Sequence, residues 1–441
     1  MAEEKLPVFN LKAVVQETGV AAPKLRTWER RYGLPRPDRA PSGHRLYSRR
    51  DIETVRWLAA RQSEGMTIGR AVALWRSLEE AGQDPLSEHI QPSPMQTKRE
   101  TLVRWREVWV AACLALDESA ANAAFRQALT LAPPEVACME VLGEGLTRIG
   151  EAWYQGHATV HQEHFASDLA LRQVQALITD LFPPSRPDSL LVVCPPGEHH
   201  TFGPLLFTYL LRRAGWRAFY LGADLPVEEV TAAARRTAPR WVIATAAHLP
   251  TVVGIQALGL SLQDVGVPLA FGGRIFNRVP ALRTRIHGYF LGERMEEAPA
   301  RLEEWAVRPP APPAPVPVPE TYRQAQIRYL EQEPFIRARV FALLFLQSLT
   351  RNLPDWLRDY FLYHIRAALI LGDMGLADFC VDWLRGLRDG FSLPDGWVKP
   401  FLMAYRKGIE QHLGREGAPI LEWLDRHIDA EDASGNFQEM Q

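Results

Sequence analysis

Glu198, His200 and Gly203 form the spacing E-x-H-x-x-G near the middle of the 441-residue chain. A neutral imidazole can bind a metal through one ring nitrogen, while a carboxylate two residues earlier orients the ring through the other. Gly203 permits close packing because it has no side chain. The short motif alone is weak evidence, since His200 could equally be an ordinary loop histidine. It nevertheless predicts His200 as a metal ligand and Glu198 as its partner.

The residues around this motif alternate short apolar runs with helical segments, over 186–307. This rhythm predicts a doubly wound parallel sheet, a Rossmann-like α/β domain. Ligands of such sheets bind beyond the carboxyl ends of the strands, and the motif follows the first expected strand directly. The expected strands are Leu190–Val193, Ala218–Leu221, Val242–Ala244, Leu269–Phe271 and Tyr289–Leu291.

The motif resembles the D-x-H-x-x-G motif of cobalamin-binding domains, with Glu198 in place of the usual Asp. The resemblance implies that His200 is the lower axial ligand of cobalt, replacing the cofactor's own dimethylbenzimidazole. It also implies that Thr245 and the pair Gly272-Gly273, at matching spacing, leave room for the displaced nucleotide tail. Ala247 departs from the family pattern, which has Leu there.

Two further histidines near the motif have no support from it. His199 is expected to be an exposed loop residue, and His248 a bystander.

Long helical periodicity precedes the sheet and predicts a four-helix bundle over residues 97–185. Within it Trp153, Glu163 and His164 form the spacing W-x9-E-H. This resembles the signature of CarH/LitR-type cobalamin-dependent photoreceptor repressors. The resemblance implies that Trp153 covers the adenosyl group of adenosylcobalamin and that Glu163 and His164 help to enclose it. The expected helices are Leu102–Leu116, Ala120–Leu131, Glu135–Trp153 and Val160–Leu181.

The bundle departs from the light-responsive members of that family at one position. They have a His directly after the Trp, which binds cobalt after photolysis, and this chain has Tyr154. His157 or His161 could substitute for it. With His164 these two have i, i+4, i+7 spacing, which could alternatively hold zinc, although no supporting acidic motif accompanies them.

The N-terminal residues 1–83 predict a small helical DNA-binding domain. Leu11–Thr18, Gly19 and Ala22–Arg31 have helix-turn-helix spacing, and the Pro- and Gly-interrupted residues after them predict a wing. Between residues 24 and 50 there are nine Lys or Arg and two acids. Such a basic stretch inside a neutral chain is typical of one DNA-binding module.

The stretch LRTWERRYGLPRPDRAPSGHRLY resembles the MerR family almost residue for residue. The resemblance implies that the second helix lies in the major groove of double-stranded DNA and that the wing contacts its backbone. One module binds weakly, so a homodimer or homotetramer is expected. The groove or phosphate candidates are Lys24, Arg26, Thr27 and Arg30, and the wing candidates are Arg39, His44, Arg45 and Tyr47.

Seven prolines within residues 309–319 predict a stiff linker over 308–320. A helical domain is expected over 321–430, followed by a disordered tail over 431–441. Thirteen aromatics between residues 335 and 405 favour an apolar core or an oligomer interface. The alternative is a pocket for a bilin or another tetrapyrrole, in an arrangement resembling photocobilins. Its candidate contacts are Arg358, His364 and Arg366.

Net charge, cysteine content and hydrophobicity exclude further classes of protein. Net charge is −2, and the four cysteines form no C-x-x-C pair, so neither a disulfide framework nor a zinc-thiolate site is indicated. No apolar run is long enough to span a membrane, and a cytoplasmic protein is expected.

Together the motifs predict a cobalamin-binding, light-responsive transcriptional regulator rather than an enzyme. Its DNA binding would be coupled to cofactor state and oligomerisation. One alternative is a corrinoid carrier of a methyltransferase, which would lack the DNA-binding head. The other is a regulator that senses a bilin or another ligand through its C-terminal domain.

Overall fold

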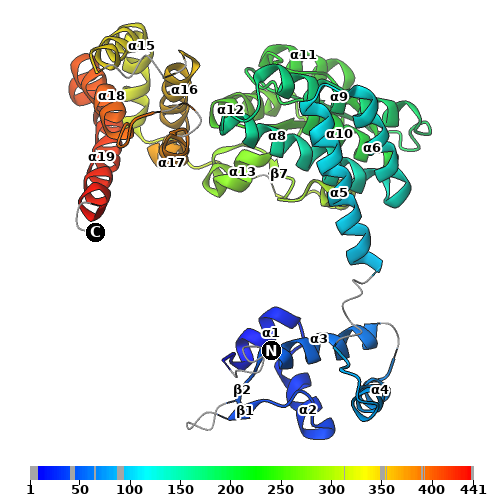
Figure 1. Ribbon diagram of the computed structural model, residues 1–441. Coiled ribbons are helices and arrows are strands. Elements are labelled where there is room, and N and C mark those ends of the chain that lie inside the picture. Colours follow the sequence, from blue (N-terminus) through cyan, green and yellow to red (C-terminus); the bar gives the residue numbers. More distant parts are fainter. Residues whose placement is uncertain are drawn as a thin grey trace. The chain divides into compact units, whose positions relative to one another are not determined.

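The computed structural model describes residues 8–39, 45–63, 66–86, 94–311, 313–347, 353, 355–388, 391 and 393–438 (Figure 1). The chain forms two compact units, Met1–Glu100 and Thr101–Gln441.

The first unit begins with the predicted helix-turn-helix. Gly19 ends the first helix with φ +69°, a left-handed conformation that suits a residue without a side chain. Antiparallel strands then form the predicted wing, with Arg39 opposite Arg45. The elements are α1 (Leu11–Thr18), α2 (Ala22–Tyr32), β1 (Asp38–Arg39), β2 (Arg45–Leu46), α3 (Arg49–Ser63) and α4 (Ile68–Glu80).

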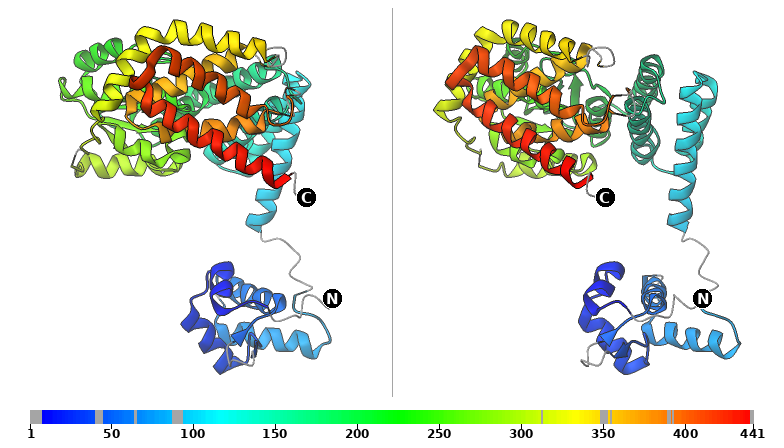
Figure 2. Two further views of the ribbon diagram at one scale, coloured as in Figure 1. Left: turned by 90° about the vertical axis from the view of Figure 1, so that its left-hand side faces the viewer. Right: turned by 60° about the vertical axis from the view of Figure 1, so that its left-hand side comes forward.

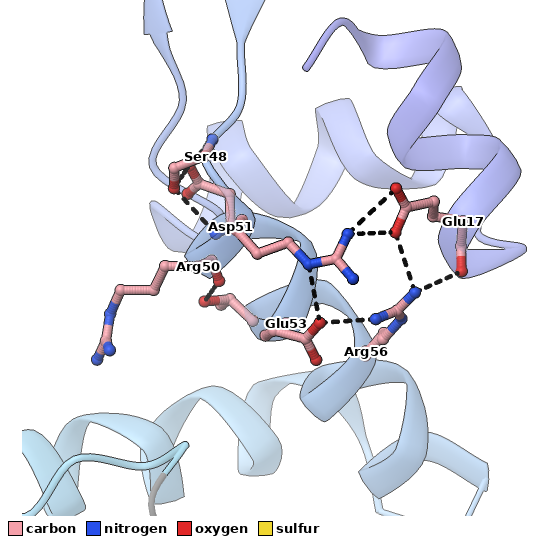
Figure 3. A network of polar contacts seen from close by, with 8 residues as sticks. Glu17, Ser48, Arg50, Asp51, Glu53 and Arg56 are labelled. Atoms are coloured by element: carbon pink, nitrogen blue, oxygen red, sulfur yellow. Dashed lines mark hydrogen bonds and ion pairs between the residues drawn. The ribbon is translucent and has the colours of Figure 1, made fainter. Parts of the chain in front are cut away.

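Ion pairs tie α1 to α3 in this unit (Figure 3). The Glu17 carboxylate lies 3.0 Å from the Arg49 guanidinium and 3.1 Å from that of Arg56, which also pairs with Glu53. The buried Asp51 accepts hydrogen bonds from the backbone N–H and hydroxyl of Ser48, at the start of α3. Arg49 and Arg56 therefore help to hold α1 against α3.

The bundle has the predicted helices, with one irregularity. The expected helix Glu135–Trp153 is not uniformly α-helical, because six residues in its first half form a π-helix. The apolar core of the bundle and one face of the sheet belong to a single apolar cluster, which α10 connects. The elements are α5 (Pro94–Leu114), α6 (Glu118–Leu131), α7 (Pro134–Ala137), η3 (Cys138–Gly143), α8 (Glu144–Tyr154) and α9 (Val160–Thr179).

The predicted parallel sheet has the strand order β4-β3-β5-β6-β7. Its apolar residues alternate between two faces: Leu190 and Val192 pack toward α10 and the bundle, while Leu191 and Val193 pack toward α11 and α12. The strands are β3 (Ser189–Val193), β4 (Arg217–Tyr220), β5 (Trp241–Thr245), β6 (Leu269–Gly272) and β7 (Tyr289–Phe290). The helices are α10 (Phe202–Arg213), α11 (Val227–Thr237), α12 (Leu249–Gln263), α13 (Arg274–Arg278), η4 (Pro280–Arg285), η5 (Met295–Glu297) and α14 (Ala298–Val307).

The proline-rich segment is not a free spacer. The Val316 backbone N–H donates to the Thr284 carbonyl at 2.9 Å, and the Tyr289 hydroxyl donates to the Pro310 carbonyl. This segment therefore follows the surface of the sheet domain before the last helices begin.

The C-terminal helices form the predicted helical domain, in which α15, α18 and α19 run side by side (Figure 2). The prediction of a disordered tail over 431–441 is wrong as far as Gln438, because α19 continues to that residue. Within this part of α19, Glu431 pairs with Arg385 and Asp432 with Lys399. Residues 439–441 lie outside the described residues. The elements are α15 (Glu320–Leu346), α16 (Asp355–Leu371), η7 (Met374–Ala377), α17 (Asp378–Gly386), α18 (Val398–Leu413), η8 (Gly414–Gly417) and α19 (Ala418–Gln438).

No helix in the described part of the chain combines the length and apolarity needed to cross a membrane.

Candidate functional site

The carboxylate of Glu198 is the centre of a hydrogen-bond network beyond the carboxyl end of β3. It is buried, and it accepts bonds from His200 Nδ1 at 2.7 Å, the Ala247 N–H at 2.7 Å and the Thr251 hydroxyl at 3.0 Å. Burial alone would raise the pKa of Glu198, but the hydrogen bonds from His200 and Ala247 outweigh it and lower the pKa to about 2. Glu198 is therefore a permanent anion at neutral pH. Despite the extra methylene, it reaches His200 as the sequence predicts.

This bond fixes how the His200 ring can bind a metal. With Nδ1–H donated to a carboxylate, the other nitrogen, Nε2, carries a free lone pair. The ring is 54% exposed, so Nε2 is accessible. The backbone N–H of His200 also bonds to Glu198, at 2.9 Å, which holds the loop as well as the ring. A carboxylate, a histidine and an accessible Nε2 are the arrangement seen in metal-binding histidines generally.

His248 lies beside this ligand, although the sequence gave it no role. It precedes α12, and its Nε2 is 3.4 Å from His200 Nε2 and 3.4 Å from an Arg274 nitrogen. Burial, reinforced by His200 and Arg274, lowers the pKa of His248 to about 3, so the ring is neutral at physiological pH. Since the guanidinium only donates, His248 Nε2 acts as the acceptor and leaves the lone pair of His200 free.

The small residues predicted at the strand ends have different roles. Thr245 is paired with Gly272 in the sheet. At Gly273, with φ +117°, a Cβ would lie 2.2 Å from the Ala246 carbonyl oxygen, so the close approach of the two chains requires glycine. A Cβ at Gly272 or Gly203 would meet only one atom, at 4.0 or 3.9 Å. A side chain as small as alanine would therefore fit at either of these two positions.

The predicted bundle residues are only partly brought together. Trp153, the penultimate residue of α8, is half-buried, and its ring packs against Trp356 of α16, with centroids 5.8 Å apart. Glu163 accepts a hydrogen bond from Ser167, and the His164 side chain is 74% exposed. Glu163 and His164 lie 3.7 Å apart, but the contacts described for them do not include Trp153.

The remaining histidine candidates of the bundle do not form a metal cluster. His157 precedes α9, whereas His161 is on it and contacts the Thr159 hydroxyl at 3.1 Å. Among the described residues, no group of three or more His, Cys, Asp or Glu is placed to hold a metal ion. A corrin brings four equatorial nitrogens of its own and needs only one ligand from below. The single oriented imidazole of His200 therefore fits cobalamin.

The three tetrapyrrole candidates of the C-terminal domain do not converge. Arg358 lies over the Phe341 ring of α15 at 4.4 Å, and Arg366 is 3.8 Å from Glu333, also on α15. His364 is buried on another side, where its Nδ1 donates to the Tyr360 carbonyl and its ring contacts Phe379. The contacts described for these three residues do not include one another, and a shared tetrapyrrole pocket stays a prediction.

The DNA-contact candidates on α2 form one exposed surface. Lys24, Arg26, Thr27 and Arg30 are exposed, while Leu25 and Trp28 fill the core of the unit. At 3.6 residues per turn, the positions of Arg26, Thr27 and Arg30 fall within about 100° around the helix axis. Lys24 lies at the edge of this surface, 5.1 Å from the Trp28 ring.

The wing candidates differ among themselves. Arg45 pairs with Glu29 at 2.7 Å, which joins the wing to α2. Tyr47 is buried in the core, so its prediction as a DNA contact is wrong: a covered ring cannot reach DNA. Arg39 lies on β1, and His44 lies outside the described residues.

Comparison with known proteins agrees with this organisation. The MerR HTH family regulatory protein model matches residues 9–78, and the B12 binding domain model matches residues 105–178. The HTH-type transcriptional repressor CarH of Myxococcus xanthus is 31% identical over 234 residues, covering 53% of this chain and 77% of that protein. This chain belongs to the CarH family of MerR-type regulators.

Two other proteins are similar to parts of this chain. The HTH-type transcriptional repressor CarA of Myxococcus xanthus is 30% identical over 233 residues, covering 52% of this chain and 74% of that protein. The structure of the Methanosarcina barkeri monomethylamine corrinoid protein is 18% identical and covers 46% of this chain and 98% of that chain, with a TM-score of 0.39.

Membership of the CarH family makes this a cobalamin-binding transcriptional regulator with a MerR-type DNA-binding domain. The sequence missed His248 because nothing local distinguishes it: its partner His200 is 48 residues away. Its position after β5 was the available signal, since β3 and β5 are neighbours and their carboxyl ends meet.

Proposed function

We propose that this protein is a light-responsive transcriptional regulator that binds adenosylcobalamin between the bundle and the sheet. DNA binding through α2 and the wing would depend on the oligomer that the cofactor-bound protein forms. The observation that carries the proposal is the His200 ring, oriented by a buried and permanently ionised Glu198. It supports His200 as the residue that would hold cobalt through Nε2.

The residues of the chain have separate roles in this proposal. His200 would hold cobalt through Nε2, and Glu198 would keep the ring in the required tautomer and orientation. Gly203 and Gly272, which project no side chain, would leave room for the nucleotide tail. Trp153 would shield the cofactor from water. Bound adenosylcobalamin would supply a cobalt–carbon bond that visible light can break.

Coupling to DNA follows from oligomerisation. A single winged helix-turn-helix buries little surface, so paired domains on one duplex bind far more tightly. A cofactor state that favours a dimer or tetramer would therefore favour operator binding, and light would shift this equilibrium. The chain would turn over no substrate. The alternative function, that of a corrinoid carrier, would not require the basic surface of α2.

The first experiment compares His200→Ala with His199→Ala, a neighbouring exposed histidine, after purification with adenosylcobalamin in darkness. Wild type and His199→Ala should retain the cofactor and show its absorption spectrum, while His200→Ala should lose the histidine-ligated spectrum. Illumination should change the absorption spectrum of the wild-type protein. It should also change the electrophoretic mobility shift that the protein causes in operator DNA. Equal cobalamin retention and identical spectra in both variants would refute the ligand assignment.

Absence of any spectral change on illumination of loaded wild type would remove the light response and leave the cobalamin site standing.

A further inference from the structure

We propose that the C-terminal helical domain is a clamp that joins the two halves of the cobalamin site, so that its docking and cofactor retention are coupled. The inference rests on the proposed site between bundle and sheet. It assigns a role to helices α16 and α17, which neither the sequence motifs nor the matched family models cover.

The clamp contacts the bundle at the two residues that end α8. The Trp153 and Trp356 rings lie 5.8 Å apart with an interplanar angle of 35°. The Tyr154 hydroxyl donates to the Trp383 carbonyl, and the rings of these two residues are 5.6 Å apart. A Cβ on Gly386 would lie 2.2 Å from the Tyr154 hydroxyl oxygen, so glycine leaves space for that hydroxyl.

The same domain contacts the sheet half of the site. The Tyr360 ring lies 6.3 Å from that of His248, the neighbour of the proposed cobalt ligand. Nearby, the Arg278 guanidinium lies 4.6 Å from the Phe379 ring, and Arg285 pairs with Asp373 at 3.2 Å. In Figure 1, α16 and α17 lie beside α12 and α13, and an apolar cluster joins α12 to the C-terminal helices.

One face of α16 makes both sets of contacts. Trp356 and Tyr360 are four residues apart, hence one turn apart on the same side of the helix. Their rings are 6.3 Å apart, and Trp383 packs on both, with centroid distances of 5.9 and 4.7 Å. The bundle and the sheet are thus connected a second time, by residues other than those of the α9–α10 contact.

This connection gives Tyr154 a structural role at the position after Trp153. Its hydroxyl is engaged with the Trp383 carbonyl, and burial raises the pKa of that phenol, so it stays a neutral donor. The residue after Trp153 therefore holds a domain in place here. Any opening that separates bundle from sheet must break the ring contacts of α16 first, and these contacts slow the escape of a cofactor held between them.

The test measures two quantities on full-length protein loaded with adenosylcobalamin in darkness. One is the rate at which cobalamin passes to an excess of a cobalamin-binding scavenger protein. The other is hydrogen exchange in residues 355–371 and 378–386, with and without cobalamin. The variants are Trp356→Ala, Tyr154→Phe and Gly386→Ala, and the control is Phe345→Ala, an aromatic residue that is 65% exposed on α15.

Trp356→Ala should release cobalamin about tenfold faster than wild type, as expected for the loss of a packed aromatic pair. Gly386→Ala and Tyr154→Phe should each release it about threefold faster, and Phe345→Ala should match wild type. Because coupling is reciprocal, cobalamin should slow hydrogen exchange in α16 and α17 of wild type.

Two results would overturn the clamp. The first is that Trp356→Ala and Gly386→Ala release cobalamin at the wild-type rate and that cobalamin does not change hydrogen exchange in α16 and α17. The other is slower release in Trp356→Ala, which would make the domain a competitor of the cofactor. Failure of the proposed function looks different, since wild type itself would then retain no cobalamin.

Discussion

The DNA-binding unit and the cobalamin site place their functional side chains in contrasting ways. On α2, three candidate contacts lie within five residues of one helix, and all are exposed. At the cobalamin site, Glu198 accepts hydrogen bonds from Ala247 and Thr251, which are 49 and 53 residues away. A contact surface for DNA can therefore be encoded in one short segment. An oriented metal ligand requires several strand ends to meet, so it depends on the stability of the whole sheet.

The largest effect is expected for Gly273→Ala, which tests how far the cobalamin site depends on the stability of the sheet. The Cβ would lie 2.2 Å from the Ala246 carbonyl oxygen at φ +117°, so we expect a loss of about 3 kcal/mol in the free energy of unfolding. Denaturant titration of full-length protein, followed by tryptophan fluorescence, would measure it. Gly272→Ala, with its nearest contact at 4.0 Å, should lose less than about 1 kcal/mol. Equal losses in both variants would contradict the packing argument, and DNA binding at low temperature should survive in each.

Glu198→Gln separates the charge of the network from its shape. Glutamine keeps an acceptor for His200 but removes the anion, and we expect cobalamin affinity to fall about 10- to 100-fold, as for other partners of metal-binding histidines. Titration by absorption would measure this, with the exposed Glu228→Gln as control. An unchanged affinity would show that the carboxylate does not orient the ligand.

The pH dependence of stability gives a second reading of Glu198. Its folded-state pKa is lowered from 4.5 to about 2. The carboxylate therefore contributes stability that is fully present above pH 4.5 and is lost as pH falls toward 2. Wild type should lose more stability than Glu198→Gln across that range in parallel denaturant titrations. Parallel curves would mean that the network contributes no pH-dependent stability.

Arg30→Ala tests the exposed surface of α2. Loss of one phosphate contact should weaken binding to promoter DNA and reduce the slope of log affinity against log salt concentration by about 0.9. Arg70→Ala, which removes an exposed arginine from α4, is the control. Fluorescence anisotropy at several salt concentrations measures both. A slope that stays at the wild-type value would remove Arg30 from the interface.

The smallest effect is expected for Glu17→Gln, which removes the anion shared by Arg49 and Arg56 (Figure 3). These side chains are largely exposed, so solvent screens the pairs and we expect a loss below about 1 kcal/mol. Thermal unfolding would measure it. A loss of several kcal/mol would mean that this network stabilises the unit as strongly as its apolar core.

Sequence reasoning was accurate where function follows from local spacing. The helix-turn-helix, the wing and the E-x-H pair all lie within short segments, and the structure places them as predicted. The prediction of Tyr47 as a DNA contact was wrong, because the motif identifies the wing but not which of its side chains are buried. The contacts of Trp153 with Trp356 and of His248 with Tyr360 join residues more than 100 positions apart, and periodicity within one helix contains no information about such pairs.

The π-helix η3 (Cys138–Gly143) sets the rotational phase of α8, which continues directly from it. A π-turn accommodates one extra residue, which advances the following helix by about 100° around its axis relative to a regular α-helix. Ten residues later that helix presents Trp153 and Tyr154 to α16 and α17. Removing a single residue from η3 would turn both side chains away from these partners while leaving the amino-acid composition of the interface intact.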